Sequence, residues 1–272
     1  TMLHCNISEG TMDNITGKVA VITGGASGIG RAVAAALARR NVKAVALVDM
    51  NAAITDVAAT LNAEAGREYA IPFQGDTTDG AFRSSVFDTM GSRFGGVGLC
   101  VPAAGITRDE LAVRMDKNTG KARIYPVEQF KLVVDVNLIA PIYWSLEMIG
   151  RIAEDRAARG LKKWTPAERM QGSVVFIGSI SSQGNRGQIS YASTKAGLEG
   201  AAATIMKEAM FHGVRCSVIH PGFTDTPMLD GQANASSPRR FQPMDPVIVA
   251  TPACCRWGIL APPRGAASRP GA

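Results

Sequence analysis

Short apolar runs alternate with longer segments of helical periodicity as far as Met228. The first run, residues 18–23, is rich in β-branched side chains, and an alanine-rich helical pattern follows over residues 31–40. This order predicts a strand, a turn and a helix, and the unit then recurs. We expect further strands over 43–49, 69–74, 98–102, 173–177 and 214–219, and further helices over 52–65, 80–93, 129–156 and 191–211.

Strands that alternate with helices in this way form parallel sheets, because a right-handed helical crossover joins each strand to the next. The predicted fold class is therefore α/β, a doubly wound parallel sheet with helices on both faces. Two long connections, residues 107–127 and 157–171, carry many charges with little periodicity and indicate surface excursions within one domain. We expect that domain to cover residues 14–230.

The pattern stops after Met228, where proline, glycine, serine and arginine become frequent. Only residues 246–250 form a run that suits a short strand. We expect an irregular or disordered tail over residues 231–272. Four of the six net positive charges lie from Ala235 onward, so the body of the chain is nearly balanced and lacks the basic stripe typical of nucleic-acid binding.

Cysteine and histidine usage argues against a disulfide framework and against a metal site. The five cysteines are odd in number and scattered, which favours a reduced, cytoplasmic protein. Cys254 and Cys255 are adjacent rather than spaced as zinc ligands, and the three histidines form no spaced set. No run of eighteen apolar residues and no export signal over residues 1–17 is present, so we expect no membrane partner.

A glycine-rich turn, Thr23-Gly24-Gly-Ala-Ser-Gly28-Ile-Gly30, lies between the first strand and the first helix. Glycines there permit a tight turn and close backbone approach, and the helix start offers free N–H groups to a pyrophosphate. Asp49 ends the second strand nineteen residues later, where a carboxylate can bind the adenosine ribose hydroxyls. The same carboxylate would repel the extra phosphate of NADP, which favours NAD. The alternatives are a turn without a ligand and a helix-capping role for Asp49.

The second candidate for chemistry is the segment from Gly178 to Lys195. On a helix, Tyr191 and Lys195 share one face about a turn apart. A tyrosine with a pKa near 10 is a poor base at neutral pH, and lowering that pKa to about 7 takes roughly 4 kcal/mol, part of which a lysine ammonium can supply. A solvated helix start capped by Ser190 would explain the same residues.

Several motifs in one order resemble the short-chain dehydrogenase/reductase family between Lys18 and Met228. They are TGGASGIG (23–30), Asp49, Asp76 in GDTTD, AAG (103–105), Asn137 in DVNL, GSIS (178–181), YASTK (191–195) and HPGFTDT (220–226). The resemblance implies a single Rossmann-type domain, an NAD(P) cofactor and reversible oxidation of an alcohol to a carbonyl. It also implies a small-molecule substrate and a homo-oligomer of two or four chains.

Carried over by position, the resemblance makes Tyr191 the general acid/base and gives Lys195 the roles of lowering its pKa and holding the nicotinamide ribose. Asn137 would position a water in a proton relay through Lys195. Ser179, twelve residues before Tyr191, is the preferred substrate-orienting serine, with Ser181 as the alternative. The expected cofactor-binding residues are Gly24, Ser27, Gly28, Ile29, Gly30, Asp49, Asp76, Thr77, Ala104, Gly105, Tyr191, Lys195, Pro221, Gly222 and Thr226.

The chain departs from the family pattern at several points. Pro102-Ala103-Ala104-Gly105 replaces the NNAG turn, so the asparagine that usually ties the central strands is absent. The two long excursions would alter the rim of the pocket. Residues 235–272 show nothing recognisable of the usual last helix and strand. A catalytically silent nucleotide-binding or regulatory protein of the same fold is therefore the alternative to an enzyme.

Overall fold

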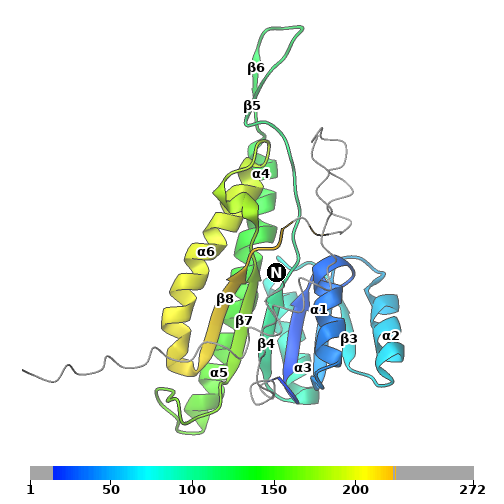
Figure 1. The fold of residues 1–272 in the computed structure, drawn as a ribbon, viewed down its shortest axis with the longest axis vertical. Coiled ribbons are helices and arrows are strands. Elements are labelled where there is room, and N and C mark those ends of the chain that lie inside the picture. The colour runs from blue at the N-terminus through cyan, green and yellow to red at the C-terminus, as the bar shows by residue number, and fades with distance from the viewer. Residues whose placement is uncertain (1–14, 223, 225–272) are drawn as a thin grey trace, which may run out of the picture.

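The computed structural model describes residues 15–222 and residue 224. Its centre is a six-stranded parallel sheet with the order β3-β2-β1-β4-β7-β8 (Figure 1). The strands are β1 (Val19–Thr23), β2 (Ala44–Asp49), β3 (Ala70–Gln74), β4 (Val97–Pro102), β7 (Gly172–Ile177) and β8 (Val214–Ile219). All six predicted strands are present within a residue or two of their expected ends, and the α/β fold class is confirmed. The predicted tail, including residues 246–250, lies outside the described residues.

Helices cover both faces of the sheet because successive strand residues point to opposite sides. On one face, Ile22, Leu47 and Val101 pack against α1 (Gly28–Ala38) and α2 (Ile54–Ala65). On the other, Val21 and Phe176 pack against α3 (Gly80–Phe94), α5 (Ala140–Ala158) and α6 (Ile189–Ala209). The strand order reverses between β1 and β4, and such a switch point opens a crevice at the carboxyl ends of the strands.

The helix expected over residues 129–156 is interrupted. It runs as α4 (Val127–Val134), a π-helical turn η2 (Asp135–Ile139) and α5. The Ala140 N–H donates to the Asp135 carbonyl, five residues back, and Pro141 has no N–H, so the carbonyl of Asn137 has no α-helical donor. The whole helix is long and apolar enough by composition to cross a membrane, but Trp144 and Met148 bury its inner face on the sheet.

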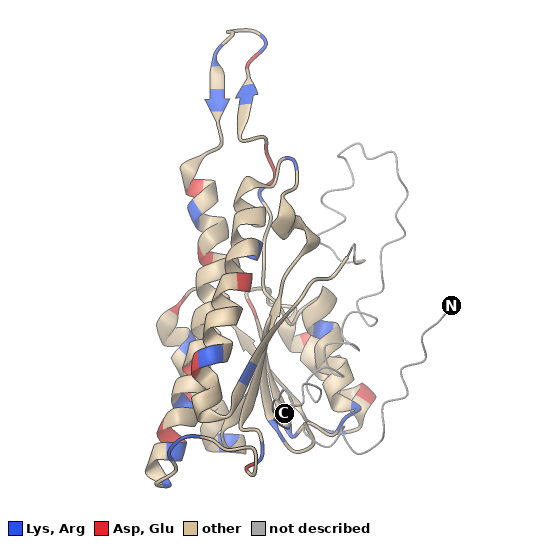
Figure 2. Ribbon diagram, turned by 60° about the vertical axis from the view of Figure 1, so that its left-hand side comes forward, with Lys and Arg blue, Asp and Glu red and all other residues tan. Residues whose placement is uncertain are grey.

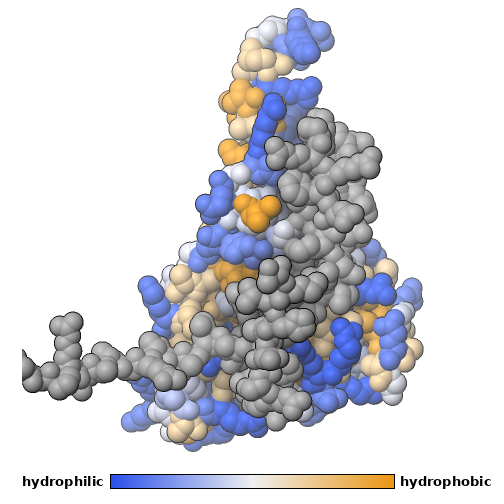
Figure 3. Space-filling model, viewed as in Figure 1, coloured by the Kyte–Doolittle hydropathy of each residue, from blue (hydrophilic) through white to orange (hydrophobic). Residues whose placement is uncertain are grey.

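The excursion over residues 107–127, for which the sequence indicated only a charged surface excursion with little periodicity, contains a β-hairpin. Its strands β5 (Val113–Met115) and β6 (Ala122–Ile124) pair antiparallel and stand clear of the body of the protein (Figure 1). Alternation places apolar side chains on one face and Arg114 beside Arg123 on the other. Figure 2 shows basic residues on both strands of the hairpin, and Figure 3 shows that apolar and polar side chains both lie on its surface. Strands of three residues are too short for their alternation to stand out in a charged sequence.

The second excursion, over residues 157–171, begins in the last turn of α5, forms no helix or strand from residue 159 onward and is held by side chains. Arg156, which is 1% exposed at the end of α5, donates to Glu168 at 2.6 Å and to the carbonyl of Lys162 at 3.0 Å. Trp164 covers Gly213, which precedes β8 and has a φ of 74°. These contacts attach the excursion to the edge of the sheet away from the crevice.

Candidate active site

The glycine loop and the start of α1 form one wall of the crevice. The helix begins at Gly28, three residues earlier than predicted, and Ser27 occupies its N-cap position without a side-chain hydrogen bond. The first-turn N–H groups are therefore not occupied by a capping side chain. A Cβ on Gly30 would lie 2.2 Å from the carbonyl oxygen of Gly24, and one on Gly24 would lie 2.7 Å from the amide nitrogen of Ala104. Only glycine fits these close approaches, and the loop presents a cradle that suits a phosphate.

Carboxylates follow at the ends of the next two strands. Asp49 accepts hydrogen bonds from Ala26 N–H at 3.0 Å and from Asn51 N–H at 2.9 Å, so it ties the glycine loop to β2. It does not cap α2, whose N-cap residue is Ala53. Asp76 accepts from the N–H and the hydroxyl of Thr78, both at 2.8 Å. These strand ends provide acceptors where an adenosine group would lie beside the cradle.

The turn after β4 lacks the asparagine of the family pattern, and other hydrogen bonds connect this turn to its neighbours. The hydroxyl of Thr23 accepts from Ala104 N–H at 3.1 Å, and the carbonyl of Thr23 accepts from Ala103 N–H at 3.2 Å. Asn137, which is fully buried in the π-helical turn, accepts from Ile106 N–H and donates to the Ile106 carbonyl, both at 2.8 Å. The strand ends therefore keep their connections through Thr23 and Asn137.

The proton relay through Asn137 stays a prediction. The amide of Asn137 accepts from and donates to Ile106, and the residue does not line the cavity, so the structure gives the side chain an anchoring role. The carbonyl of Asn137 has no α-helical donor, because residue 141 is proline. A relay through this residue would therefore use that carbonyl.

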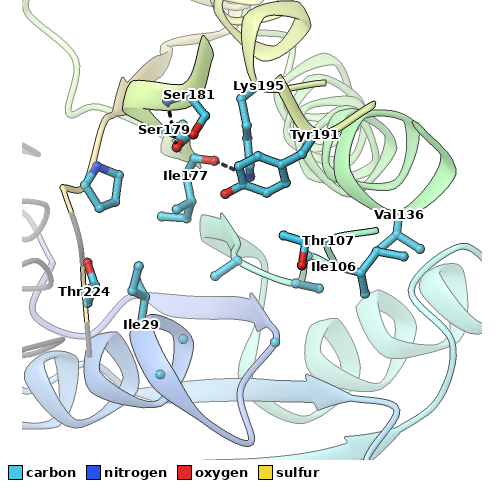
Figure 4. Close-up of a pocket in the computed structure, with 18 of the residues that line it drawn as sticks. Ile29, Ile106, Thr107, Val136, Ile177, Ser179, Ser181, Tyr191, Lys195 and Thr224 are labelled. Atoms are coloured by element: carbon cyan, nitrogen blue, oxygen red, sulfur yellow. Dashed lines mark hydrogen bonds between the residues drawn. The ribbon is translucent and has the colours of Figure 1, made fainter. Parts of the chain in front are cut away.

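Tyr191, Lys195 and Ser179 meet on the opposite wall (Figure 4). Tyr191 and Lys195 lie one turn apart near the start of α6, with the Lys195 ammonium 5.4 Å from the centroid of the tyrosine ring. Lys195 is 6% exposed and donates to the carbonyl of Ile177 at 2.7 Å. The Ser179 hydroxyl accepts from Ser181 N–H at 3.1 Å, and Ser179 lines the same cavity as Tyr191. The predicted phenol, amine and hydroxyl are therefore brought together.

The electrostatics differ from the expectation that Lys195 lowers the pKa of Tyr191. Burial raises the pKa of Tyr191 above its ordinary value; the Ser179 hydrogen bond opposes this rise and the Asp109 carboxylate adds to it. Burial also lowers the pKa of Lys195 to about 8. Burial disfavours the phenolate and outweighs the Ser179 contribution, so the protein alone does not produce the phenolate.

Sequence reasoning missed a polar network beside the serines. Gln188, the N-cap residue of α6, is 7% exposed and lines the cavity. Its amide contacts Ser181 and Asn185 in the loop before α6 and Asp109 in a distant segment ahead of β5. Ser190 does not cap the helix as in the alternative considered above, because it is buried against the hydroxyl of Tyr125 at 3.0 Å. No sequence pattern reports such contacts between distant segments.

One cavity of about 810 Å³ joins the two walls, a size within the range of ligand sites. Apart from Asn137, every predicted site residue within the described part of the chain lines it, and Thr226 lies outside the described residues. Beyond these, the lining includes Ile106, Thr107, Arg108, Leu132, Val136, Ile180, Ser181, Asn185, Gln188 and Thr224. Of these additional residues, Ile106, Leu132, Val136 and Ile180 are apolar, and Arg108 is a cation.

A glycine cradle and a tyrosine–lysine pair at the switch point of a parallel sheet define a Rossmann-type α/β protein with an enzyme-like site. The chain belongs to the short-chain dehydrogenase family, because the family model described as "short chain dehydrogenase" matches residues 18–236. The resemblance stated from the motifs is thereby confirmed. Members of this family are oxidoreductases that use nicotinamide cofactors.

Individual relatives agree with this assignment. The chain is 30% identical to 3-oxoacyl-[acyl-carrier-protein] reductase FabG of Vibrio cholerae over 224 residues, which cover 79% of this chain and 77% of the relative. It is 32% identical to (3R)-3-hydroxyacyl-CoA dehydrogenase of Mus musculus over 218 residues, covering 77% and 75%. A short-chain type dehydrogenase/reductase from Mycobacterium marinum has the same fold, with a TM-score of 0.74, 22% identity and 89% coverage of both chains.

Proposed function

We propose that the protein is an NAD-dependent oxidoreductase that interconverts a secondary alcohol and a carbonyl, with Tyr191 as the general acid/base. The observation that carries the proposal is the common cavity, which places the Tyr191 phenol, the Ser179 hydroxyl and the Lys195 ammonium on the wall opposite the glycine cradle. A hydride donor or acceptor held in that cradle can extend towards the tyrosine, and this is the geometry that alcohol oxidation requires.

The residues present fit a nicotinamide dinucleotide. The cradle from Gly24 to Gly30 would hold the pyrophosphate, Asp49 and Asp76 the adenosine end, and Lys195 the nicotinamide ribose. When bound, the cofactor would accept a hydride from the alcohol carbon during oxidation and return it during reduction. Everything else in the reaction falls to the protein, which must orient the substrate oxygen and move one proton.

Tyr191 moves that proton. In the oxidising direction its phenolate takes the hydroxyl proton of the alcohol, and in the reducing direction its hydroxyl protonates the substrate oxygen. The Ser179 hydroxyl donates to the same oxygen and fixes its position. Because burial raises the pKa of Tyr191, the phenolate needs nearby positive charge, which a protonated Lys195 supplies together with the oxidised nicotinamide. The tyrosine therefore becomes a base only in the assembled complex.

Asp49 supports a preference for NAD over NADP. Its two carboxylate oxygens face the glycine loop and Asn51, beside the position of the adenosine ribose. The extra phosphate of NADP would lie against this charge, and among the described residues of the cavity lining no cation accompanies Asp49. We expect calorimetry to show that NADH binds more tightly than NADPH. A clear preference for NADPH would contradict the role given to Asp49.

The first substrates to test are 3-oxoacyl and 3-hydroxyacyl thioesters, because the names of two relatives specify such groups. Apolar side chains of Ile106, Leu132, Val136 and Ile180 line the cavity near Tyr191 and suit an alkyl chain. Secondary alcohols, polyols, hydroxysteroids and other ketones complete the panel. Turnover that survives Tyr191→Phe undiminished would overturn the mechanism, and NADH binding without turnover of any member would favour the silent nucleotide-binding alternative.

The two serines are distinguished by single variants. Ser179→Ala removes the hydroxyl that lines the cavity together with Tyr191, so we expect a fall in kcat of about 10²-fold, the usual size for one oriented donor. Ser181→Ala should have a much smaller effect, because the Ser181 hydroxyl donates to Gln188 at 3.0 Å. The reverse order of effects would make Ser181 the catalytic serine.

We also propose that the chain forms a homo-oligomer. Leu132, Ile139, Tyr143 and Leu146 are each between 41% and 51% exposed along α4, η2 and α5. An apolar row of this kind on one long helix suits a helix–helix contact between copies. Light scattering coupled to size-exclusion chromatography tests the proposal, with Tyr143→Glu as the variant expected to shift the protein to a smaller species. A monomeric wild-type protein would contradict it.

A further inference from the structure

Gln188 is held by more hydrogen bonds than any neighbouring residue of the serine loop. Its amide nitrogen donates to Asp109 Oδ2 at 2.7 Å. Its amide oxygen accepts from the Ser181 hydroxyl at 3.0 Å and from the Asn185 amide at 2.9 Å. The side chain is 93% buried, so each of these polar groups depends on the others for a partner.

Chemistry dictates the orientation of this amide. A carboxylate can only accept hydrogen bonds, so the nitrogen of Gln188 must face Asp109 and the oxygen must face Ser181. Ser181 then has to donate its single hydroxyl proton to Gln188. A hydroxyl whose proton is committed in this way cannot donate it to a substrate oxygen.

Ser179 is left in the opposite state. The N–H of Ser181 donates to the Ser179 hydroxyl oxygen at 3.1 Å, which occupies an acceptor position and leaves the Ser179 proton available for Tyr191 or a substrate. A chain of contacts thus runs from Asp109 through Gln188 and Ser181 to Ser179 and ends at the catalytic tyrosine.

We propose that Asp109 and Gln188 are positioning residues of the active site. Asp109 orients the Gln188 amide, and the amide oxygen accepts the hydroxyl proton of Ser181. Ser179 is therefore the serine that donates to the substrate. This inference rests on the proposed oxidoreductase function and explains why only one of two adjacent serines serves it. It also links the base of the β5–β6 hairpin to the catalytic helix, because Glu110 N–H donates to the Gly187 carbonyl at 2.8 Å.

Asp109 also acts on Tyr191 through space. The charged groups around the phenol are Lys195 on α6 and, ahead of β5, Asp109 with the cavity-lining Arg108. The Asp109 carboxylate adds to the rise in the pKa of Tyr191, so a neutral residue in its place should favour the phenolate. Asp109 is largely exposed, and solvent therefore moderates this effect.

The first experiment needs no substrate. The phenolate absorbance of Tyr191 is obtained as the difference between each protein and its Tyr191→Phe counterpart, at an alkaline pH where circular dichroism shows native structure. We expect Asp109→Asn to show more phenolate than wild type. Asp116→Asn, which removes a carboxylate from the hairpin turn, is the matched control and should show no change. Equal phenolate in Asp109→Asn and wild type would overturn the electrostatic part of the proposal.

The second experiment tests the selection between serines. In a Ser179→Ala background, Gln188→Met should free the Ser181 hydroxyl and raise kcat at least severalfold above Ser179→Ala alone, and a further Ser181→Ala should abolish the gain. No gain in a double variant that still binds NADH would overturn the positioning role. If wild type shows no turnover that depends on Tyr191, the proposed oxidoreductase function is wrong. The phenolate measurement would still show whether Asp109 affects the ionisation of Tyr191.

Discussion

Replacing Asn137 by alanine tests the anchor between the π-helical turn and the loop after β4. The substitution removes the acceptor for Ile106 N–H and the donor to the Ile106 carbonyl, both at 2.8 Å, from a site with no exposure to solvent. Each backbone group left without its partner costs about 1–2 kcal/mol, so the free energy of unfolding should fall by roughly 2–4 kcal/mol. For a domain of this size, that corresponds to a fall in Tm of roughly 5–15 °C.

Urea denaturation and thermal unfolding followed by circular dichroism measure this loss. Asn118→Ala is the control, because Asn118 lies exposed in the hairpin turn, and it should unfold like wild type. Asn137→Asp should also destabilise the protein, since a carboxylate cannot donate to the Ile106 carbonyl. If Asn137→Ala unfolds within about 1 °C of wild type, the two hydrogen bonds do not anchor the loop and the reasoning fails.

Three further predictions concern the cradle, the lysine and the hairpin. Gly30→Ala places a Cβ 2.2 Å from the Gly24 carbonyl oxygen and should weaken NADH binding at least tenfold by calorimetry, whereas Gly150→Ala, with no atom within 4 Å of its Cβ, should bind NADH like wild type. Equal affinities of the two variants would refute the assignment of the glycine loop as the cofactor cradle. The pKa of Lys195 is about 8 in the folded protein and returns to 10.5 on unfolding, so the free energy of unfolding of wild type should rise by about 3 kcal/mol relative to Lys195→Met as the pH increases from 8 to 10.5. Urea titrations that give parallel pH profiles for the two proteins would contradict this. The Tyr125 N–H donates to the Ala112 carbonyl at 2.9 Å and so joins the backbone on either side of residues 113–124. A variant in which a two-residue turn replaces these residues should therefore have nearly the Tm of wild type, and a large fall in Tm would show that the hairpin supports the fold.

The sheet and its glycine loop could be predicted because their determinants are local. Each strand is a short run of apolar, largely β-branched residues, and each crossover helix repeats its apolar positions with helical spacing. The residues that meet in the cavity could be named because strand ends of a parallel sheet converge at one edge. Gly24, Asp49, Ser179 and Tyr191 come from three strand–helix junctions and line the same cavity.

Features that depend on contacts between distant segments could not be predicted. Gln188 is polar and lies three residues before Tyr191, yet only the fold brings it to Asp109, seventy-nine residues away. The anchoring role of Asn137 also depends on the fold, since its amide contacts Ile106, thirty-one residues earlier in the chain. Helical periodicity did not reveal the π-helical turn, because one wider turn shifts the apolar pattern too little to stand out.

That turn makes the position of the site depend on the length of the chain. A π-helical turn accommodates one residue more than the α-helical path, so deletion of a single residue within Asp135–Ile139 would shorten the path between α4 and α5. Such a deletion would displace Asn137 from Ile106 and break both of its amide hydrogen bonds. A change of length here would therefore act on the site without replacing any residue that lines the cavity.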